Sequence, residues 1–277
     1  MLSEKTGDRE ALLRARLATT QLLQLSGKPG AADRAVAGSL QLARDAGDPW
    51  QVCRLLEMQA HAALRQGDSD RAVALLEEVV RLARQAGDSW SLATALSELG
   101  DVARARDAHA DAGGYYRESL ALRGVLGIPG ATPSLQHNLG YVALASADLG
   151  EAARSFSAAL GRFRHVDDQR GMVECLIGLA GVLAAAGEAE TAARLFGASD
   201  AALEALGAAI WPSNRSDYER CLARARGALD PEVFGAAWDA GRSLLLDDAF
   251  TVASHACERW LMPAARRYQA SQPPTVL

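Results

Sequence analysis

Small residues recur along this chain at a nearly constant interval, and this repetition limits its possible folds more than any other feature. An alanine stands at the same phase in five successive segments, and the last three of the four intervals are identical while the first is slightly shorter. The alanines are Ala35, Ala72, Ala112, Ala152 and Ala192. In the last four segments a large residue follows four positions later, and another small residue precedes the alanine by twelve. A fixed period of this kind predicts a repeat array, in which each unit packs on its neighbours.

The segment 139–159 indicates what each unit contains. Its spacings match the tetratricopeptide (TPR) pattern, which describes two antiparallel helices per repeat. Gly140 and Ala152 stand where two helices approach closely, and Phe156 fills the space between helix pairs. The sequence therefore predicts an all-α fold, a TPR-like right-handed superhelix of antiparallel helix pairs with a helical C-terminal cap. The alternative is a generic Ala/Leu-rich bundle without a true repeat.

Breaks in the helical periodicity divide the chain into an array, a cap and a tail. The array covers 1–207 and begins with an irregular first repeat, 8–47, that contains a helix near 8–25 and another near 31–46. Four regular repeats fill 49–206. Their helix pairs are 49–66 with 69–86, 89–106 with 109–125, 133–147 with 150–165, and 169–186 with 189–206. The cap covers 208–262, with helices near 213–229, 230–241 and 247–262. The residues 263–277 are predicted to be a largely disordered tail.

Charge and cysteine usage narrow the functional classes. The net charge of −5 disfavours nucleic-acid binding, because neutralising phosphates requires a basic surface. Four cysteines, which form no CxxC pair, favour a reducing, cytoplasmic setting. No signal peptide or membrane-spanning run is recognisable. We therefore expect a cytoplasmic protein that contacts neither nucleic acid nor a membrane directly.

The sequence offers no pattern typical of catalysis. The five histidines are scattered, with no HExxH or paired Cys/His spacing, so no metal site is expected. The glycine- and proline-rich segment 127–133 lacks the Gly-Lys-Ser/Thr ending of a phosphate-binding loop and is interpreted as a turn. Alternations such as Arg224-Ala225-Arg226 are interpreted as solvated helix faces. We expect no enzyme, no catalytic residue and no cofactor.

The first helix of each pair lines the concave surface of a TPR array, and this places a candidate groove. Positions that point inward from these helices are charged in the early repeats and become small and apolar in the later ones. The candidate partner-binding residues are Arg54, Glu57, His61, Asp101, Arg104, His137, Tyr141 and Glu174. Bidentate arginines and a nearby histidine favour an acidic or carboxylate-bearing partner. The alternative is an ordinary solvated surface whose apolar end is covered by the C-terminal helices.

The end of the array and the cap together resemble a known group of regulators. The segment 192–198, Ala-Ala-Arg-Leu-Phe-Gly-Ala, and the spaced residues 217–219, Phe234, 237–238 and 241–242 carry the resemblance. They are similar to the last repeats of bacterial ATP-dependent LuxR-type and SARP-type regulators and of cyclase–ATPase–TPR proteins, whose arrays are MalT-like. Residues 31–256 are covered, but no P-loop occurs and no helix-turn-helix is evident after Ala256.

The resemblance implies the sensor and interaction part of a bacterial transcriptional or signalling regulator, without the ATPase or DNA-binding activity. Such a module binds a protein, a peptide or a small-molecule effector. Two alternatives stay open. The first is a structural module that mediates self-association into a homo-oligomer. The second, more remote, is an enzyme that uses the concave groove as a pocket.

Overall fold

The computed structural model describes residues 29–127 and 132–261, and all regular secondary structure within these ranges is helical. The predicted helix near 8–25, most of the turn at 127–133 and the predicted tail 263–277 lie outside the described residues. Within them, no helix is long and apolar enough to cross a membrane. The chain forms two compact units, Met1–Val102 with Glu118–Gly127 and Ala103–Arg117 with Ile128–Leu277, and each is described separately below.

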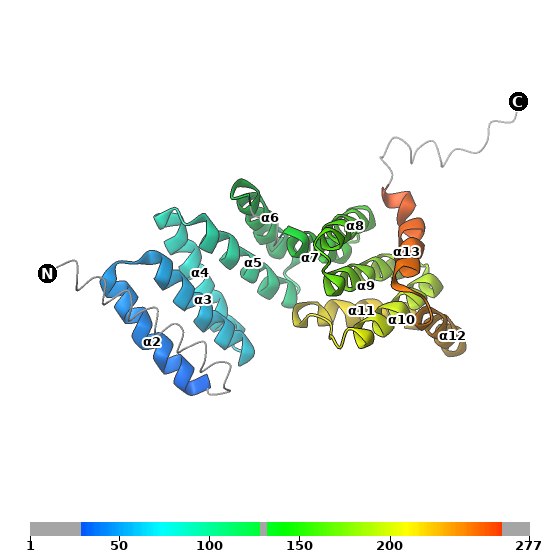
Figure 1. The fold of residues 1–277 in the computed structure, drawn as a ribbon, viewed down its shortest axis with the longest axis horizontal. Helices are drawn as coiled ribbons and strands as arrows, with labels where there is room; N and C mark the ends of the chain where they lie inside the picture. Colours follow the sequence, from blue (N-terminus) through cyan, green and yellow to red (C-terminus); the bar gives the residue numbers. More distant parts are fainter. Residues whose placement is uncertain (1–28, 128–131, 262–277) are drawn as a thin grey trace, which may run out of the picture. The chain divides into compact units, whose positions relative to one another are not determined.

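Twelve α-helices and one short 3-10 helix follow one another in the described residues (Figure 1). They are α2 (Pro29–Ala46), α3 (Pro49–Arg65), α4 (Ser69–Ala86), α5 (Ser89–Ala105), α6 (His109–Val125), α7 (Thr132–Ala145), α8 (Leu149–His165), α9 (Gln169–Ala185), α10 (Ala189–Ala205), η1 (Pro212–Asn214), α11 (Arg215–Gly227), α12 (Pro231–Arg242) and α13 (Leu246–Leu261). Every helix predicted between 31 and 262 is confirmed, with its ends displaced by about two residues at most.

The turns between helices repeat at a constant interval, which is half the period seen in the sequence. In the described residues, each position with a positive φ falls on this interval: Gly47, Gly67, Gly87, Asp107, Gly127, Ala147, Asp167, Gly187 and Gly207. Where the next residue is described, its N–H donates to the carbonyl five positions back, as Asp148 does to Ala143 at 2.9 Å. This is the Schellman arrangement, which satisfies carbonyls at the end of a helix. One turn type therefore serves both the turn within a pair and the turn between pairs.

An aspartate then starts the next helix in five of these turns. The Oδ1 atoms of Asp48, Asp68, Asp88, Asp148 and Asp168 accept hydrogen bonds from the N–H three residues later, at 2.8–3.1 Å. Each cap satisfies a backbone donor that has no partner inside the helix and contributes about 1 kcal/mol. In three of these turns a glycine–aspartate dipeptide thus combines the end of one helix with the start of another, and in the other two Ala147 or Asp167 takes the place of the glycine.

Small residues at the repeat positions allow the helices to approach closely, as predicted. Ala72, Ala152 and Ala192 have no exposed surface, and consecutive helices such as α3 with α4 and α7 with α8 pack as pairs. A Cβ atom built on Gly140 would lie 2.7 Å from the ring of Phe156, which has no exposed surface either. The large residue therefore occupies the space that the glycine leaves open.

Replacing Ala152 with leucine should lower the free energy of unfolding by about 1–3 kcal/mol, because the added carbons must enter a filled helix contact. Ala158 is the matched control, since it lies on the same helix with its side chain exposed. Urea denaturation of the two leucine variants measures the difference. Equal losses at the two positions would contradict the close-contact role of Ala152.

Helices α12 and α13 cover parts of the second unit. Helix α12 packs on α10, and α13 packs on α8, α9 and α10 (Figure 1). The α10–α12 contact is close because a Cβ on Gly197 would meet the carbonyl of Trp238, and a Cβ on Gly241 would meet the carbonyl of Arg194. Gly197, Trp238 and Gly241 belong to the motif that carried the resemblance. In this chain, they form the contact between the last regular helix and the helix that covers it.

Candidate functional site

Helix α11 occupies the inner face of the second unit. It packs against α9 and α10, and η1 precedes it directly (Figure 1). The residues that the sequence places on this inner face are almost fully buried: Arg104 is 2%, His137 0%, Tyr141 1% and Glu174 0% exposed. This agrees with the alternative in which C-terminal helices cover the later repeats. Of these four residues only Tyr141 lines a pocket, and the role of all four in partner binding stays a prediction.

The Arg104 guanidinium organises the buried polar groups of the second unit. It donates from Nη1 to Asp217 Oδ2 at 2.6 Å and from Nη2 to Asn214 Oδ1 at 2.7 Å. Its Nε donates to the Tyr116 hydroxyl at 3.3 Å, and its Cζ lies 5.2 Å from the centre of the Tyr141 ring. A buried charge needs such complete pairing, because an uncompensated charge in the interior is strongly destabilising.

Asn214 connects this arginine to Glu174. Its Nδ2 donates to Glu174 Oε2 at 2.9 Å, while the Trp211 N–H donates to Oε1 at 2.5 Å. Burial raises the pKa of Glu174, and the two hydrogen bonds oppose that rise. Burial also lowers the pKa of His137 to about 4, with a smaller contribution from Arg104. His137 is therefore neutral near pH 7, and its Nε2–H donates to the Glu174 carbonyl at 3.2 Å.

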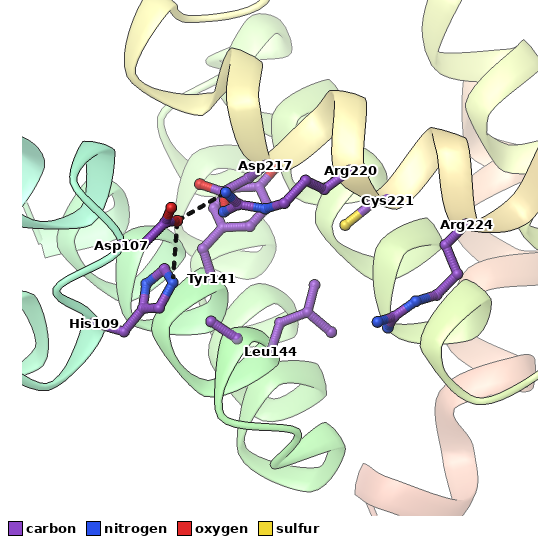
Figure 2. A pocket seen from close by; sticks show the side chains of 9 residues that line it. Asp107, His109, Tyr141, Leu144, Asp217, Arg220, Cys221 and Arg224 are labelled. Atoms are coloured by element: carbon purple, nitrogen blue, oxygen red, sulfur yellow. Dashed lines mark hydrogen bonds and ion pairs between the residues drawn. The ribbon is translucent and has the colours of Figure 1, made fainter.

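A pocket of about 330 Å³ opens beside this buried network (Figure 2). Asp107 interacts with both His109 and Arg220, and Arg220 continues to Asp217. The Arg220 Nη1–Asp107 Oδ1 distance is 2.9 Å, and the Arg220 Nη2–Asp217 Oδ1 distance is 2.5 Å. The lining residues are Asp107, His109, Tyr141, Leu144, Ala145, Asp217, Arg220, Cys221 and Arg224.

Two polar groups of this pocket have no hydrogen-bond partner within the described residues. Arg224 is exposed and lies across the pocket from Leu144 (Figure 2). Its guanidinium forms no ion pair with any of the described residues. The Tyr141 hydroxyl is buried and likewise has no partner there. Cys221 offers no nucleophile, because burial raises the pKa of its thiol to about 12. The pocket is therefore suited to binding a ligand and lacks an activated thiol for covalent chemistry.

Comparison with known proteins identifies the architecture. No protein-family model matches the sequence, and no curated protein matches it. Solved structures do match it, among them BtubC (BKLC) from P. vanneervenii, with 20% identity, a TM-score of 0.59, and 79% of this chain and 80% of that chain covered. The fold is TPR-like. Two structures of a Podosopora anserina protein, described as kinesin light chain with nearly identical TPR-like repeats, match at TM-scores of 0.57 and 0.52. The first is 17% identical, and the match covers 70% of this chain and 96% of that chain. The second is 16% identical, and the match covers 78% of this chain and 94% of that chain.

The other predicted groove residues belong to the first unit of the TPR-like array. Arg54, Glu57 and His61 line a separate pocket of about 210 Å³ on α3, and Asp101 is half-buried on α5. His61 Nε2 lies 2.7 Å from Glu98 Oε1, and this hydrogen bond raises the pKa of the histidine. The structure thus brings three of the eight predicted residues together here, and it brings Arg104, His137, Tyr141 and Glu174 together in the second unit.

Sequence reasoning gave no site role to Asn214, Asp217, Arg220 or Arg224. Arg224 was assigned to a solvated face, and it is exposed while the next residue, Ala225, is buried. Asp217 and Arg104 are separated by 113 positions, so no local pattern could connect them. One signal was available. Asp217, Arg220, Cys221 and Arg224 recur at spacings of three and four, which places them on one face of a helix. Within the described residues, no group of histidines, cysteines and carboxylates could hold a metal ion.

Proposed function

We propose that this chain is a non-catalytic interaction module that binds a carboxylate-bearing segment of a protein or peptide in the pocket of Figure 2. A TPR-like array is suited to this role because its stacked helices present an extended surface to a partner. The proposal retains the acidic partner expected from the sequence and moves its recognition to α11. The two arginines that line the pocket, Arg220 and Arg224, lie on that helix.

The observation that carries the proposal is the pairing of charges at the pocket. Two guanidinium groups, those of Arg220 and Arg224, and two carboxylates, those of Asp107 and Asp217, line it, and the buried Arg104 also pairs with Asp217. Arg104 and Arg220 are paired with these carboxylates, which leaves the Arg224 guanidinium available. A free guanidinium beside an apolar wall binds a carboxylate through two parallel hydrogen bonds, which orient the ligand as well as attract it. Leu144 and the Tyr141 ring provide the apolar wall.

We also propose a context and a domain division for the module. The α10–α12 contact uses the residues that resemble bacterial LuxR-type and SARP-type regulators, and this supports a role as the sensor part of such a regulator. In that division, residues 1–207 form the array, 208–262 the cap and 263–277 the tail. Helix α11 would then act both as part of the cap and as one wall of the binding pocket.

Replacing Arg224 with glutamine should weaken carboxylate binding by about 10- to 100-fold, since hydrogen bonds to charged groups contribute about 1.5–3 kcal/mol. The probe is a mixture of N-acetylated pentapeptides of uncharged residues with free C-terminal carboxylates, compared with the same mixture amidated at the C-terminus. Thermal-shift titration measures binding, because a ligand of the folded state raises the melting temperature as its occupancy increases. Only the free acids should stabilise the wild type, and added salt should reduce the effect.

Arg215→Gln is the matched control, because Arg215 is exposed on the same helix and does not line the pocket. This variant should bind as the wild type does. Equal stabilisation by acids and amides, or unchanged binding by Arg224→Gln, would rule out the proposed site. A melting temperature that depends on protein concentration, with no response to peptides, would instead favour the self-association alternative.

A further inference from the structure

The first unit contains a second pocket whose walls are two exposed tryptophans. Trp50 is 46% exposed and Trp90 is 53% exposed, and both line a cavity of about 210 Å³ together with Arg54, Glu57 and His61. The two tryptophans stand one repeat apart, each as the second residue of its helix, α3 or α5. Each directly follows a turn capped by an aspartate, Asp48 or Asp88. The repeat therefore places two large aromatic side chains at one cavity.

The Glu57 carboxylate lines the same cavity, and the Glu98 and Asp88 carboxylates lie near enough to raise its pKa. Glu57 Oε1, Glu98 Oε2 and Asp88 Oδ2 are buried and have no hydrogen-bond partner among the described residues. Burial raises the pKa of Glu57 to about 7, and the Glu98 and Asp88 carboxylates act in the same direction. Leaving a buried acceptor unsatisfied is unfavourable, and more so for a charged one. These oxygens therefore favour a donor that carries positive charge.

The balance of charges around Glu57 also favours a cation. The groups that face it are the Glu98 and Asp88 carboxylates of the α5 side and the Arg54 and His61 side chains of α3. His61 is already engaged with Glu98 at 2.7 Å. The Arg54 guanidinium lies over the Trp50 ring, with its Cζ 5.0 Å from the ring centre, so that this aromatic surface already holds a cation. The Trp90 ring has no such partner within the described part of the chain.

We propose that Trp50, Trp90 and Glu57 form a binding site for a basic side chain, a lysine or an arginine, of a partner protein. The Trp90 indole face attracts the cation through its quadrupole, the Glu57 carboxylate accepts its hydrogen bonds, and the Trp50 ring lines the same cavity. The cavity is large enough for the end of one such side chain, and the exposed indole rims remain for the adjoining peptide. This site is distinct from the carboxylate-binding pocket. It takes a cation in place of an anion, it is formed by other residues, and it lies in the first unit.

Titration with three capped tripeptides tests the proposal: Gly-Lys-Gly, Gly-Arg-Gly and Gly-norleucine-Gly. The indole N–H signals of Trp50 and Trp90, assigned with Trp→Phe variants, report binding in NMR spectra of the whole chain. The lysine and arginine peptides should shift both signals with a dissociation constant on the order of 1 mM, whereas norleucine, which lacks the charge, should not. The Glu57→Gln and Trp90→Ala variants should each bind roughly tenfold more weakly.

Affinity should also rise with pH. Between about pH 6 and pH 8 Glu57, whose pKa is about 7, loses its proton, which makes the cavity more negative, so the lysine peptide should bind roughly tenfold more tightly at the upper end. The Glu57→Gln variant should show a flatter profile. The control is Glu77→Gln, at an exposed glutamate on α4 outside the cavity, which should change neither the affinity nor the profile. Equal binding of the norleucine peptide, unchanged binding by Glu57→Gln, or no shift with millimolar concentrations of any peptide would overturn the proposal. None of these results bears on the Arg224 pocket.

Discussion

Replacing Arg104 with methionine should lower the free energy of unfolding by about 3 kcal/mol, because removing one member of a buried ion pair leaves the other charge uncompensated. The Asp217 carboxylate would keep its contact with Arg220 but lose the 2.6 Å bond to Arg104. Asn214 and Tyr116 would lose a donor at the same time. Urea denaturation monitored by circular dichroism measures the loss.

Arg84→Met is the surface counterpart of this change. The Arg84 side chain is 54% exposed and pairs with Glu118 at 2.8 Å, so its replacement should lower the stability by less than about 1 kcal/mol. The double variant Arg104→Met/Asp217→Leu should recover part of the loss, because it removes both buried charges together. Equal effects of the two single arginine variants would contradict the burial and pairing seen at Arg104.

Replacing Gly241 with alanine should lower the free energy of unfolding by about 2–3 kcal/mol, because the new methyl group would enter the backbone of α10. A Cβ at this position would overlap the Arg194 carbonyl, and a carbonyl inside a helix cannot turn aside as a flexible side chain can. Helix α12 would have to move outward, which would expose Phe234 and Ala237. Limited proteolysis should then cut more rapidly near α12.

Gly235 is the control on the same helix. A Cβ there would meet nothing within 4 Å, so Gly235→Ala should leave the protein unchanged or more stable by up to about 1 kcal/mol, as alanine favours the helix. Chemical denaturation of the two variants side by side gives the comparison. A stable Gly241→Ala protein with unchanged proteolysis would show that α10 and α12 do not need this close contact.

The helices and their pairing could be predicted because their signals are local. Glycine–aspartate turns mark the ends, and the alternation of alanine with large residues fixes the phase of each pair. Gly140 and Phe156 illustrate this, because their predicted complementarity is a direct contact between neighbouring helices. The sequence shows less clearly that a turn occurs every half repeat, because three of the turns have Asp107, Ala147 or Asp167 in place of glycine at the position with positive φ.

The candidate sites could be predicted only in part, because they depend on long-range packing. The helical offsets predicted Arg104 and Tyr141 on an inner face, and both side chains are buried in the structure. They could not show that α11 packs over these residues, because Arg104 and its partner Asp217 are 113 positions apart in the sequence. In the first unit, where Trp50 and Trp90 line the cavity with three predicted residues, the same offsets led to a pocket. There the carboxylates around Glu57 favour a basic ligand in place of the acidic partner expected from Arg54 and His61.

The uniform turns also bear on how a gene of this kind can lengthen or shorten. Each helix with its turn occupies the same length of chain, and successive helices in a pair run in opposite directions. Losing or gaining one helix would therefore reverse the direction of everything downstream, while a change of one whole repeat would restore both direction and packing phase. Unequal recombination in steps of one repeat should consequently be tolerated, and single-helix steps should be eliminated. The length of such an array then changes by whole pairs of helices, and the C-terminal helices can still close its last pair after each step.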